Sequence, residues 1–87
     1  MSPSDERVLN RCIVHGEVTT EVQKACDKWA PFNSAHEGYA VILEELDELW
    51  EEVKRKVPNK QAMRKEAIQV AAMAIRFAAE LTEEDGE

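Results

Sequence analysis

A run of acidic residues in the middle of the chain is the part of the sequence best suited to metal-dependent chemistry. Seven acids and no base lie between Glu37 and Val53. Glu45 and Glu48 are one helical turn apart, so on a helix their carboxylates can reach a common ion. Like charges at this spacing repel, whereas Mg²⁺, a hard cation that prefers oxygen ligands, would reverse the penalty. The spacing suits a magnesium site, with Mn²⁺ as a substitute, but by itself it favours the alternative, a solvated acidic helix face.

A second group of polar residues lies on the later, mostly apolar stretch of the chain. Its members form a narrow polar stripe at helical spacing: Glu66, Gln69, Arg76 and Glu80. A carboxylate on an otherwise buried helix is costly unless it is paired or binds a cation. We therefore expect Glu66 to join the metal site, the alternatives being contact with water or pairing with Arg64 or Lys65. Arg76 is expected either to contact a phosphate or to form an ion pair between subunits.

Three helices are predicted to position these groups. The expected ranges are 5–29, 35–56 and 60–81, with a frayed tail over 82–87. Pro31 and Pro58 end the first two helices because proline cannot continue a helix. Ser34 and Glu37 have the spacing of a capping box at the start of the second helix, and Asn59 is a cap for the third. The fold class is therefore all-α, in a single domain over residues 1–87.

Apolar residues of the second helix repeat at alternating intervals of four and three. They are Tyr39, Leu43, Leu46, Trp50, Val53 and Val57. This spacing is typical of a seam that faces other helices, with Leu46 and Val53 at the centre of the buried face. The third helix is apolar nearly all round, and two partner helices cannot surround it. We therefore expect a helical bundle completed by homo-oligomerisation, as a homodimer or homotetramer in which third helices meet.

Composition limits the partners and the compartment. The 87 residues include 11 basic and 18 acidic side chains, a net charge of −7, which disfavours direct binding to nucleic acid or to anionic membranes. No apolar run reaches the ~20 residues of a membrane-spanning helix, and no secretory signal is visible. Cys12 and Cys26 would lie about 21 Å apart along one helix, too far for a disulfide. A cytoplasmic protein with free thiols is expected.

The acidic pattern resembles that of a known enzyme family. The segment Glu44-Glu45-Leu46-Asp47-Glu48-Leu49, followed by Glu66-Ala67-Ile68-Gln69, is similar to the paired motifs of the MazG-like, all-α nucleoside triphosphate pyrophosphohydrolases. The resemblance covers roughly residues 34–81. It implies that Glu45, Glu48 and Glu66 hold Mg²⁺ against a triphosphate, with Glu44 as a further ligand or as the base. It also implies that water attack releases a nucleoside monophosphate and pyrophosphate.

One position departs from the family pattern. Gln69 stands where the family has Asp, and its amide oxygen can still ligate Mg²⁺, but it adds no negative charge and binds more weakly. A second hypothesis is therefore a MazG-like scaffold that binds nucleotide or assembles, with hydrolysis weakened by Gln69. A third is an acidic helical interaction module that docks a basic partner protein.

Aromatic residues near the first connection are candidates for contact with a nucleotide base. Trp29, Phe32 and Tyr39 flank this segment and could stack on a base, with Asn33 reading its edge. Packing within the core is the alternative for the aromatic rings. The expected substrate-binding residues are accordingly Trp29, Asn33 and Arg76.

Overall fold

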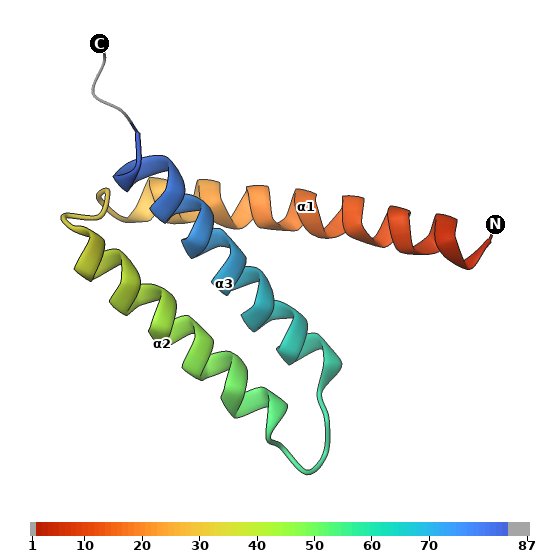
Figure 1. The fold of residues 1–87 in the computed structure, drawn as a ribbon. Coiled ribbons are helices and arrows are strands. Elements are labelled where there is room, and N and C mark those ends of the chain that lie inside the picture. Colours follow the sequence, from red (N-terminus) through yellow and green to blue (C-terminus); the bar gives the residue numbers. More distant parts are fainter. Residues whose placement is uncertain (1, 84–87) are drawn as a thin grey trace.

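The chain folds into three α-helices, which the computed structural model describes over residues 2–83 (Figure 1). The helices are α1 (Pro3–Lys28), α2 (Ala35–Val53) and α3 (Lys60–Leu81). No strand occurs within the described residues, so the predicted all-α class is confirmed. Residues 84–87, which belong to the tail predicted to fray, lie outside the described residues.

Helix α1 begins two residues before its predicted start. The Ser2 hydroxyl accepts a hydrogen bond from the Asp5 backbone N–H at 3.3 Å, and the Asp5 carboxylate accepts one from the Ser2 backbone N–H at 3.3 Å. This is a capping box, which satisfies N–H groups that the first turn leaves free. Pro3 fits at the first helical position because its missing N–H has no intrahelical partner there.

The predicted capping box at the start of α2 is only half formed. The Ser34 hydroxyl accepts from the Glu37 backbone N–H at 3.1 Å, as expected for an N-cap. The Glu37 carboxylate, however, accepts from the backbone N–H of Asn33 at 3.1 Å. Glu37 therefore holds the connecting segment that precedes the helix.

Helix α2 ends at Val53, so the predicted extension to residue 56 is wrong. The backbone N–H of Lys54 still bonds to the Trp50 carbonyl, but the chain then leaves the helix ahead of Pro58, whose ring disfavours helical backbone before it. The Asn59 side chain accepts from the Ala62 backbone N–H at 3.0 Å. This contact confirms Asn59 as the cap of α3.

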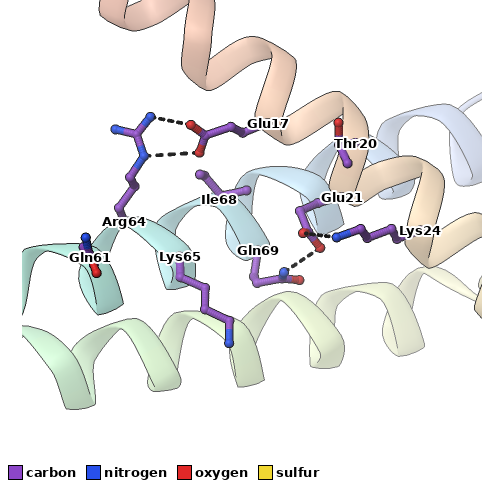
Figure 2. Close-up of a pocket in the computed structure, with 9 residues that line it drawn as sticks. All are labelled: Glu17, Thr20, Glu21, Lys24, Gln61, Arg64, Lys65, Ile68 and Gln69. Carbon is purple, nitrogen blue, oxygen red and sulfur yellow. Dashed lines mark hydrogen bonds and ion pairs between the residues drawn. The ribbon is translucent and has the colours of Figure 1, made fainter.

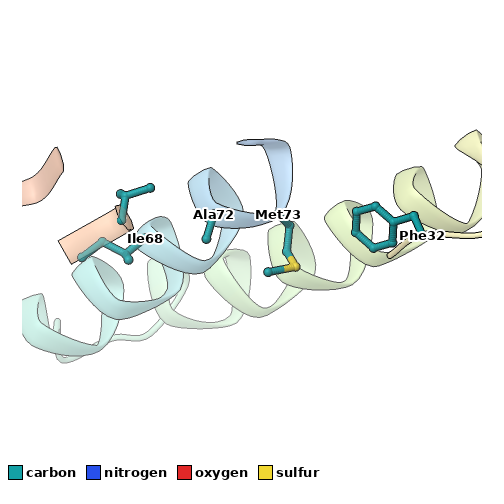
Figure 3. Packing of buried hydrophobic residues seen from close by; sticks show 5 residues of the cluster. Phe32, Ile68, Ala72 and Met73 are labelled. Carbon is teal, nitrogen blue, oxygen red and sulfur yellow. The ribbon is translucent and has the colours of Figure 1, made fainter. Parts of the chain in front are cut away.

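Helix α3 packs against both other helices, whereas α1 and α2 do not pack against each other within the described residues (Figure 1). The buried core combines one residue of α1, one of the connecting segment and three of α3: Val18, Phe32, Ile68, Ala72 and Met73 (Figure 3). The N-terminal part of α1 extends beyond α3 (Figure 1), and residues 3–13 make no part of this core. Helix α3 is therefore covered on two sides, and Ile75 on a third side remains 47% exposed.

The apolar seam of α2 is not covered by the chain's own helices. Leu46 and Val53, predicted at the centre of the buried face, are 48% and 50% exposed, and Trp50 is 58% exposed. Helix α2 instead packs on α3 through the face that includes the buried Gly38. A Cβ atom at position 38 would lie 2.7 Å from Cδ2 of Phe77, so a larger residue here would force the side chains of α3 to shift.

Helix α1 contributes Val18 to the core, and its residues Val14, Val22 and Ala25 pack against that core. Cys12 and Cys26 are free thiols, as expected, and both are exposed. No helix within residues 2–83 combines the length and the apolar character needed to cross a lipid bilayer.

Candidate metal centre

Three carboxylates from two helices converge between α2 and α3. Glu45 and Glu48 come from α2 and Glu66 comes from α3, and one oxygen atom of each lies within 4.8 Å of the others. The two α2 residues share a face because they are one turn apart. Packing of α3 along α2 then adds Glu66. The structure thus brings together Glu45, Glu48 and Glu66, which were considered as metal ligands from the sequence.

The three carboxylates disfavour one another's charge. Burial, followed by repulsion from Glu48, raises the pKa of Glu45 from its ordinary value of 4.5 to about 7. Burial and then Glu48 also raise the pKa of Glu66, while Lys65 offsets part of this effect. No basic side chain within residues 2–83 forms an ion pair with any of the three. Within the described residues, therefore, no ion pair neutralises the cluster.

Arg64, an alternative partner for Glu66, is engaged elsewhere. Its guanidinium donates to both carboxylate oxygens of Glu17 on α1, at 3.2 and 2.6 Å. This contact lowers the pKa of Glu17, chiefly through the hydrogen bond from Arg64. The ion pair stands on one side of a small groove of about 420 Å³ between α1 and α3 that contains none of the three clustered glutamates (Figure 2). This groove joins two helices and holds no part of the candidate metal centre.

Glu52 lies next to the cluster and also repels Glu66. Its Oε1 atom is buried and accepts no hydrogen bond from the described residues. Arg55 Nε lies 3.1 Å from this atom, as an ion pair without hydrogen-bond alignment. A fourth carboxylate, which is paired with Arg55, thus lies on the same side of α2.

Gln69 makes a contact with α1 that sequence reasoning missed. Its amide nitrogen donates to Oε2 of Glu21 on α1 at 2.8 Å, and Lys24 lies 3.5 Å from the other oxygen of Glu21 (Figure 2). Because the nitrogen is occupied, the amide oxygen is the atom of Gln69 left for another partner. Nothing in the spacing of the sequence signals this pairing between distant helices.

A larger groove, of about 710 Å³, borders the metal centre. Its walls are the end of α1, the connecting segment, the first half of α2 and the facing part of α3. Towards the middle of α2 it is lined by Glu44, Glu45 and Gln69. Towards the connecting segment it is lined by three residues predicted to bind substrate: Trp29, Asn33 and Arg76. The groove therefore joins these residues to part of the carboxylate cluster, while Glu48 and Glu66 do not line it.

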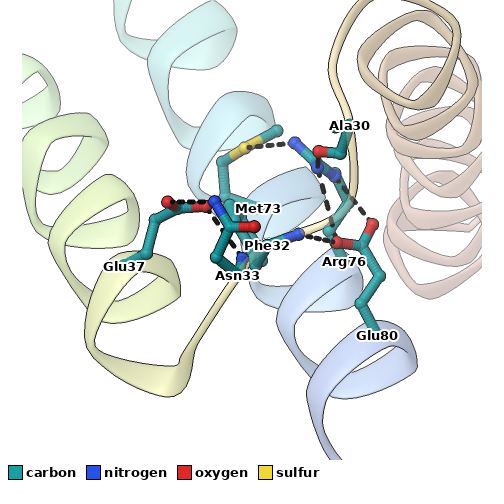
Figure 4. A network of polar contacts seen from close by, with 7 residues as sticks. All are labelled: Ala30, Phe32, Asn33, Glu37, Met73, Arg76 and Glu80. Carbon is teal, nitrogen blue, oxygen red and sulfur yellow. Dashed lines mark hydrogen bonds and ion pairs between the residues drawn. The ribbon is translucent and has the colours of Figure 1, made fainter.

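Arg76 is held within the chain by a polar network at this end of the groove (Figure 4). Its Nε donates to Glu80 at 3.0 Å, and its Nη2 donates to the carbonyl oxygen of Ala30 at 3.0 Å. The other carboxylate oxygen of Glu80 accepts from the Phe32 backbone N–H at 2.8 Å. An ion pair of Arg76 is thus present, but it is internal to α3, and a spacing of four residues between a base and an acid was its signal in the sequence.

The charge of this network is balanced. Burial pushes the pKa of Glu80 upward, but the hydrogen bonds from Arg76 and from the Phe32 N–H outweigh it, and the pKa is lowered overall. Glu80 is therefore ionised and neutralises Arg76. The carboxylates of Glu45, Glu48 and Glu66 have no comparable partner among residues 2–83.

A comparison of the chain with protein-family models, curated proteins and solved structures finds no match.

Proposed function

We propose that this chain is a Mg²⁺-dependent nucleoside triphosphate pyrophosphohydrolase of the MazG-like kind, which releases a nucleoside monophosphate and pyrophosphate. The observation that carries the proposal is the convergence of Glu45, Glu48 and Glu66. These are the residues that the motif resemblance implies as ligands. Carboxylate oxygens are the ligands that Mg²⁺ takes in phosphate-binding sites.

The electrostatics of the cluster fit a divalent cation. The raised pKa values of Glu45 and Glu66 mean that gathering these carboxylates is unfavourable in the chain alone. A protein rarely assembles such a group for stability, and perturbed carboxylates beside a groove are typical of functional sites. A cation held by the three residues would offset the repulsion, and Mn²⁺, which takes the same oxygen donors, would substitute for Mg²⁺.

The residues along the groove have separate roles in the proposed reaction. Bound Mg²⁺ supplies neutralisation of phosphate charge and a lower pKa for water. Lys24 and Lys28 of α1 line the groove with Glu44 and would attract the triphosphate. Glu44, which is exposed, accepts a proton from the water that attacks the α-phosphorus. A bond forms from the water oxygen to this phosphorus, and the bond to the oxygen bridging the β-phosphorus breaks, so that pyrophosphate leaves.

A weakened scaffold is the second candidate, and one contact favours it. Gln69 adds no negative charge, and its amide is tied to Glu21. A chain of this type would bind Mg²⁺ and nucleotide without turning over. The acidic interaction module requires only an exposed acidic face. It therefore predicts that replacing any one acid of α2 weakens the binding of a basic partner protein by a similar, small amount.

We also propose that a second copy covers the exposed seam of α2, giving a homodimer or a homotetramer. Leu46, Trp50 and Val53 are each about half exposed in the single chain, and seams with this spacing pack against other helices. Leu46→Glu should therefore lower the mass measured by light scattering to that of one chain. Leu9→Glu, on the exposed part of α1, is the matched control. A wild-type protein that is monomeric at all concentrations would contradict the proposal.

A panel of nucleoside triphosphates tests the hydrolase directly. Each is incubated with protein and Mg²⁺, and pyrophosphate release is measured. Glu45→Gln should reduce the rate at least about 100-fold, because even residues that only support a metal ligand commonly change activity 10- to 100-fold. Glu51→Gln, an exposed acid on the same helix, is the control and should stay near the wild-type rate.

Each outcome separates the candidates. Equal rates for Glu45→Gln and wild type would overturn the proposed metal centre. No product from any nucleotide, together with retained Mg²⁺ binding, would favour the scaffold. In that case Gln69→Asp should create activity, because it restores the carboxylate of the family pattern.

A further inference from the structure

A carboxylate of α1 contacts the motif position at which the chain departs from the family pattern. Glu21 accepts a hydrogen bond from the side-chain amide of Gln69 at 2.8 Å, although the two residues are 48 positions apart in the sequence (Figure 2). Helices α1 and α2 do not pack against each other within residues 2–83, so α1 meets the residues of the paired motifs through α3. The contact therefore gives α1 a route by which it can influence the metal centre.

This hydrogen bond determines which way the Gln69 amide points. A carboxylate accepts hydrogen bonds and does not donate one, so the amide nitrogen faces Glu21 and the amide oxygen points elsewhere. Among residues 2–83, the hydrogen bond to Glu21 is the polar contact that the Gln69 side chain makes, and no donor reaches its oxygen. The oxygen is thus oriented by the protein and has room for a ligand of opposite charge.

Glu21 is itself held in place by two partners. Gln69 donates to its Oε2 atom, and the Lys24 ammonium lies 3.5 Å from its Oε1 atom, so each carboxylate oxygen has one partner. The Glu21 side chain is 28% exposed, against 69% for Lys24. Because Lys24 offsets the charge of Glu21, the effect of Glu21 on a cation nearby comes chiefly from the orientation of the amide and not from long-range attraction.

The position of Gln69 on α3 suits a role beside the carboxylates. Gln69 follows Glu66 by three residues, so the two side chains lie along one face of the helix. Gln69, Glu21 and Glu45 all line the larger groove. An amide oxygen is a neutral ligand that hard divalent cations accept together with carboxylates. A Gln side chain without a fixed orientation presents either its nitrogen or its oxygen, whereas one that is bonded to Glu21 presents its oxygen.

We propose that Glu21 is a positioning residue of the metal centre, which holds the Gln69 amide so that its oxygen joins the carboxylates of α2 and α3 as a ligand. The inference rests on the proposed function in taking a divalent cation to bind at these carboxylates. It adds a role for α1, a helix that lies outside the segment covered by the motif resemblance. In this chain, the pair formed by Glu21 and Gln69 takes the place of the single Asp of the family pattern.

Binding of Mn²⁺ alone tests the inference without nucleotide and without turnover. Free Mn²⁺ gives a sharp electron paramagnetic resonance signal that is lost when the ion binds to protein, so a titration measures the affinity directly. Glu21→Ala removes the acceptor and should weaken Mn²⁺ binding about tenfold, as is usual when a residue that orients a metal ligand is lost. Glu17→Ala is the matched control and should leave the affinity unchanged, because Glu17 also links α1 to α3, but through Arg64. Circular dichroism checks that both variants fold.

Two further variants separate orientation of the amide from charge and from general support of the fold. Glu21→Gln keeps an oxygen that accepts the hydrogen bond from Gln69 but carries no charge, so it should bind Mn²⁺ nearly as well as the wild type. In a Gln69→Ala background, Glu21→Ala should cause no further loss, because no amide oxygen remains to be oriented. A merely structural role of Glu21 would weaken binding equally in both backgrounds.

The outcomes distinguish the inference from the proposed function. Three results would each overturn the role of Glu21: wild-type affinity in Glu21→Ala, a loss in Glu21→Gln as large as in Glu21→Ala, or the same loss in the Gln69→Ala background. Pyrophosphate release that requires Glu45 would leave the hydrolase in place in all three cases. The expected Mn²⁺ pattern without pyrophosphate release from any nucleotide would overturn the hydrolase and leave the role of Glu21 in place. Absence of Mn²⁺ binding would overturn both.

Discussion

Acidic residues have opposite surroundings on the two sides of α3. On the α1 side, Glu17 meets the guanidinium of Arg64 and Glu21 meets the amide of Gln69, so each carboxylate faces a donor. On the α2 side, Glu45 and Glu48 meet another carboxylate, Glu66. The pKa values reflect this difference, because the pKa of Glu17 is lowered and that of Glu45 is raised to about 7. Acids that are paired with a donor link two helices, whereas unpaired acids gathered at a helix interface indicate a site for a ligand.

The largest expected contrast between the two sides is in the response to metal. Mg²⁺ should raise the stability of the wild-type protein, by about 2.7 kcal/mol when its concentration is 100 times Kd. Glu48→Ala should abolish this gain, which thermal unfolding with and without Mg²⁺ measures. Glu51→Ala, on the same helix but outside the cluster, should retain it. A similar gain in both variants would mean that Mg²⁺ binds the acidic helix without using the cluster.

The next largest expected contrast is in how tightly α2 and α1 pack at their glycine residues. Gly38→Ala should lower the free energy of unfolding by about 1–2 kcal/mol, because its Cβ would lie 2.7 Å from Phe77 and 2.9 Å from Leu81. Gly16→Ala on α1 should instead raise it by about 0.5–1 kcal/mol, since no atom lies within 4 Å of the new Cβ and alanine favours the helix. Chemical denaturation of the two variants measures the contrast. Destabilisation by both would show that α1 packs as tightly at Gly16.

A smaller effect is expected in the pH dependence of stability without metal. Glu45 binds its proton more tightly in the folded chain, with a pKa of about 7, than in the unfolded chain, near 4.5. Stability should therefore fall as pH rises between these values. Glu45→Gln should remove this fall and stabilise the protein at pH 8 by about 1 kcal/mol, once solvent screening of the half-buried group is allowed for. Melting curves in a chelator from pH 5 to 8 test the sign, which would be reversed for a carboxylate stabilised by a cation of the protein.

The smallest expected effect on stability is on the α1 side of α3, where the acids are paired. Glu17→Gln should lower the melting temperature slightly, and about 0.5 M NaCl should abolish the difference from wild type, because exposed ion pairs are screened by salt. Melting curves at low and high salt measure it. A loss that persists at high salt would indicate that Glu17 supports the α1 contact by packing and not by charge.

The ends of the helices and the composition of the cluster could largely be predicted from the sequence. Ser34 and Asn59 act as caps because short polar side chains bond to free N–H groups at helix starts. Glu45 and Glu48 share a face by spacing alone. Glu66 was added by the motif, and the structure places it beside them. Local rules therefore account for the helices, and for two members of the cluster.

The packing of α2 could not be predicted in the same way. Its most regular apolar stripe, which contains Leu46 and Trp50, faces outward, and the face of Gly38 meets α3. Periodicity shows that a face is apolar but does not identify the partner that covers it. Glu21 and Gln69 illustrate the same limit, because their contact depends on how α1 crosses α3 and not on spacing within either helix.

The hydrogen bond from the Phe32 N–H to Glu80 ties a connecting segment to the last turn of α3. A backbone N–H outside any helix usually exchanges its hydrogen quickly, unless opening requires a larger unit to unfold. Fraying of the C-terminal turn of α3 would release both the Phe32 N–H and the Arg76 guanidinium. The Phe32 amide should therefore exchange at the rate of that helical turn. The rate at which the last turn of α3 frays thus determines how often the Phe32 and Arg76 contacts at this end of the groove are broken.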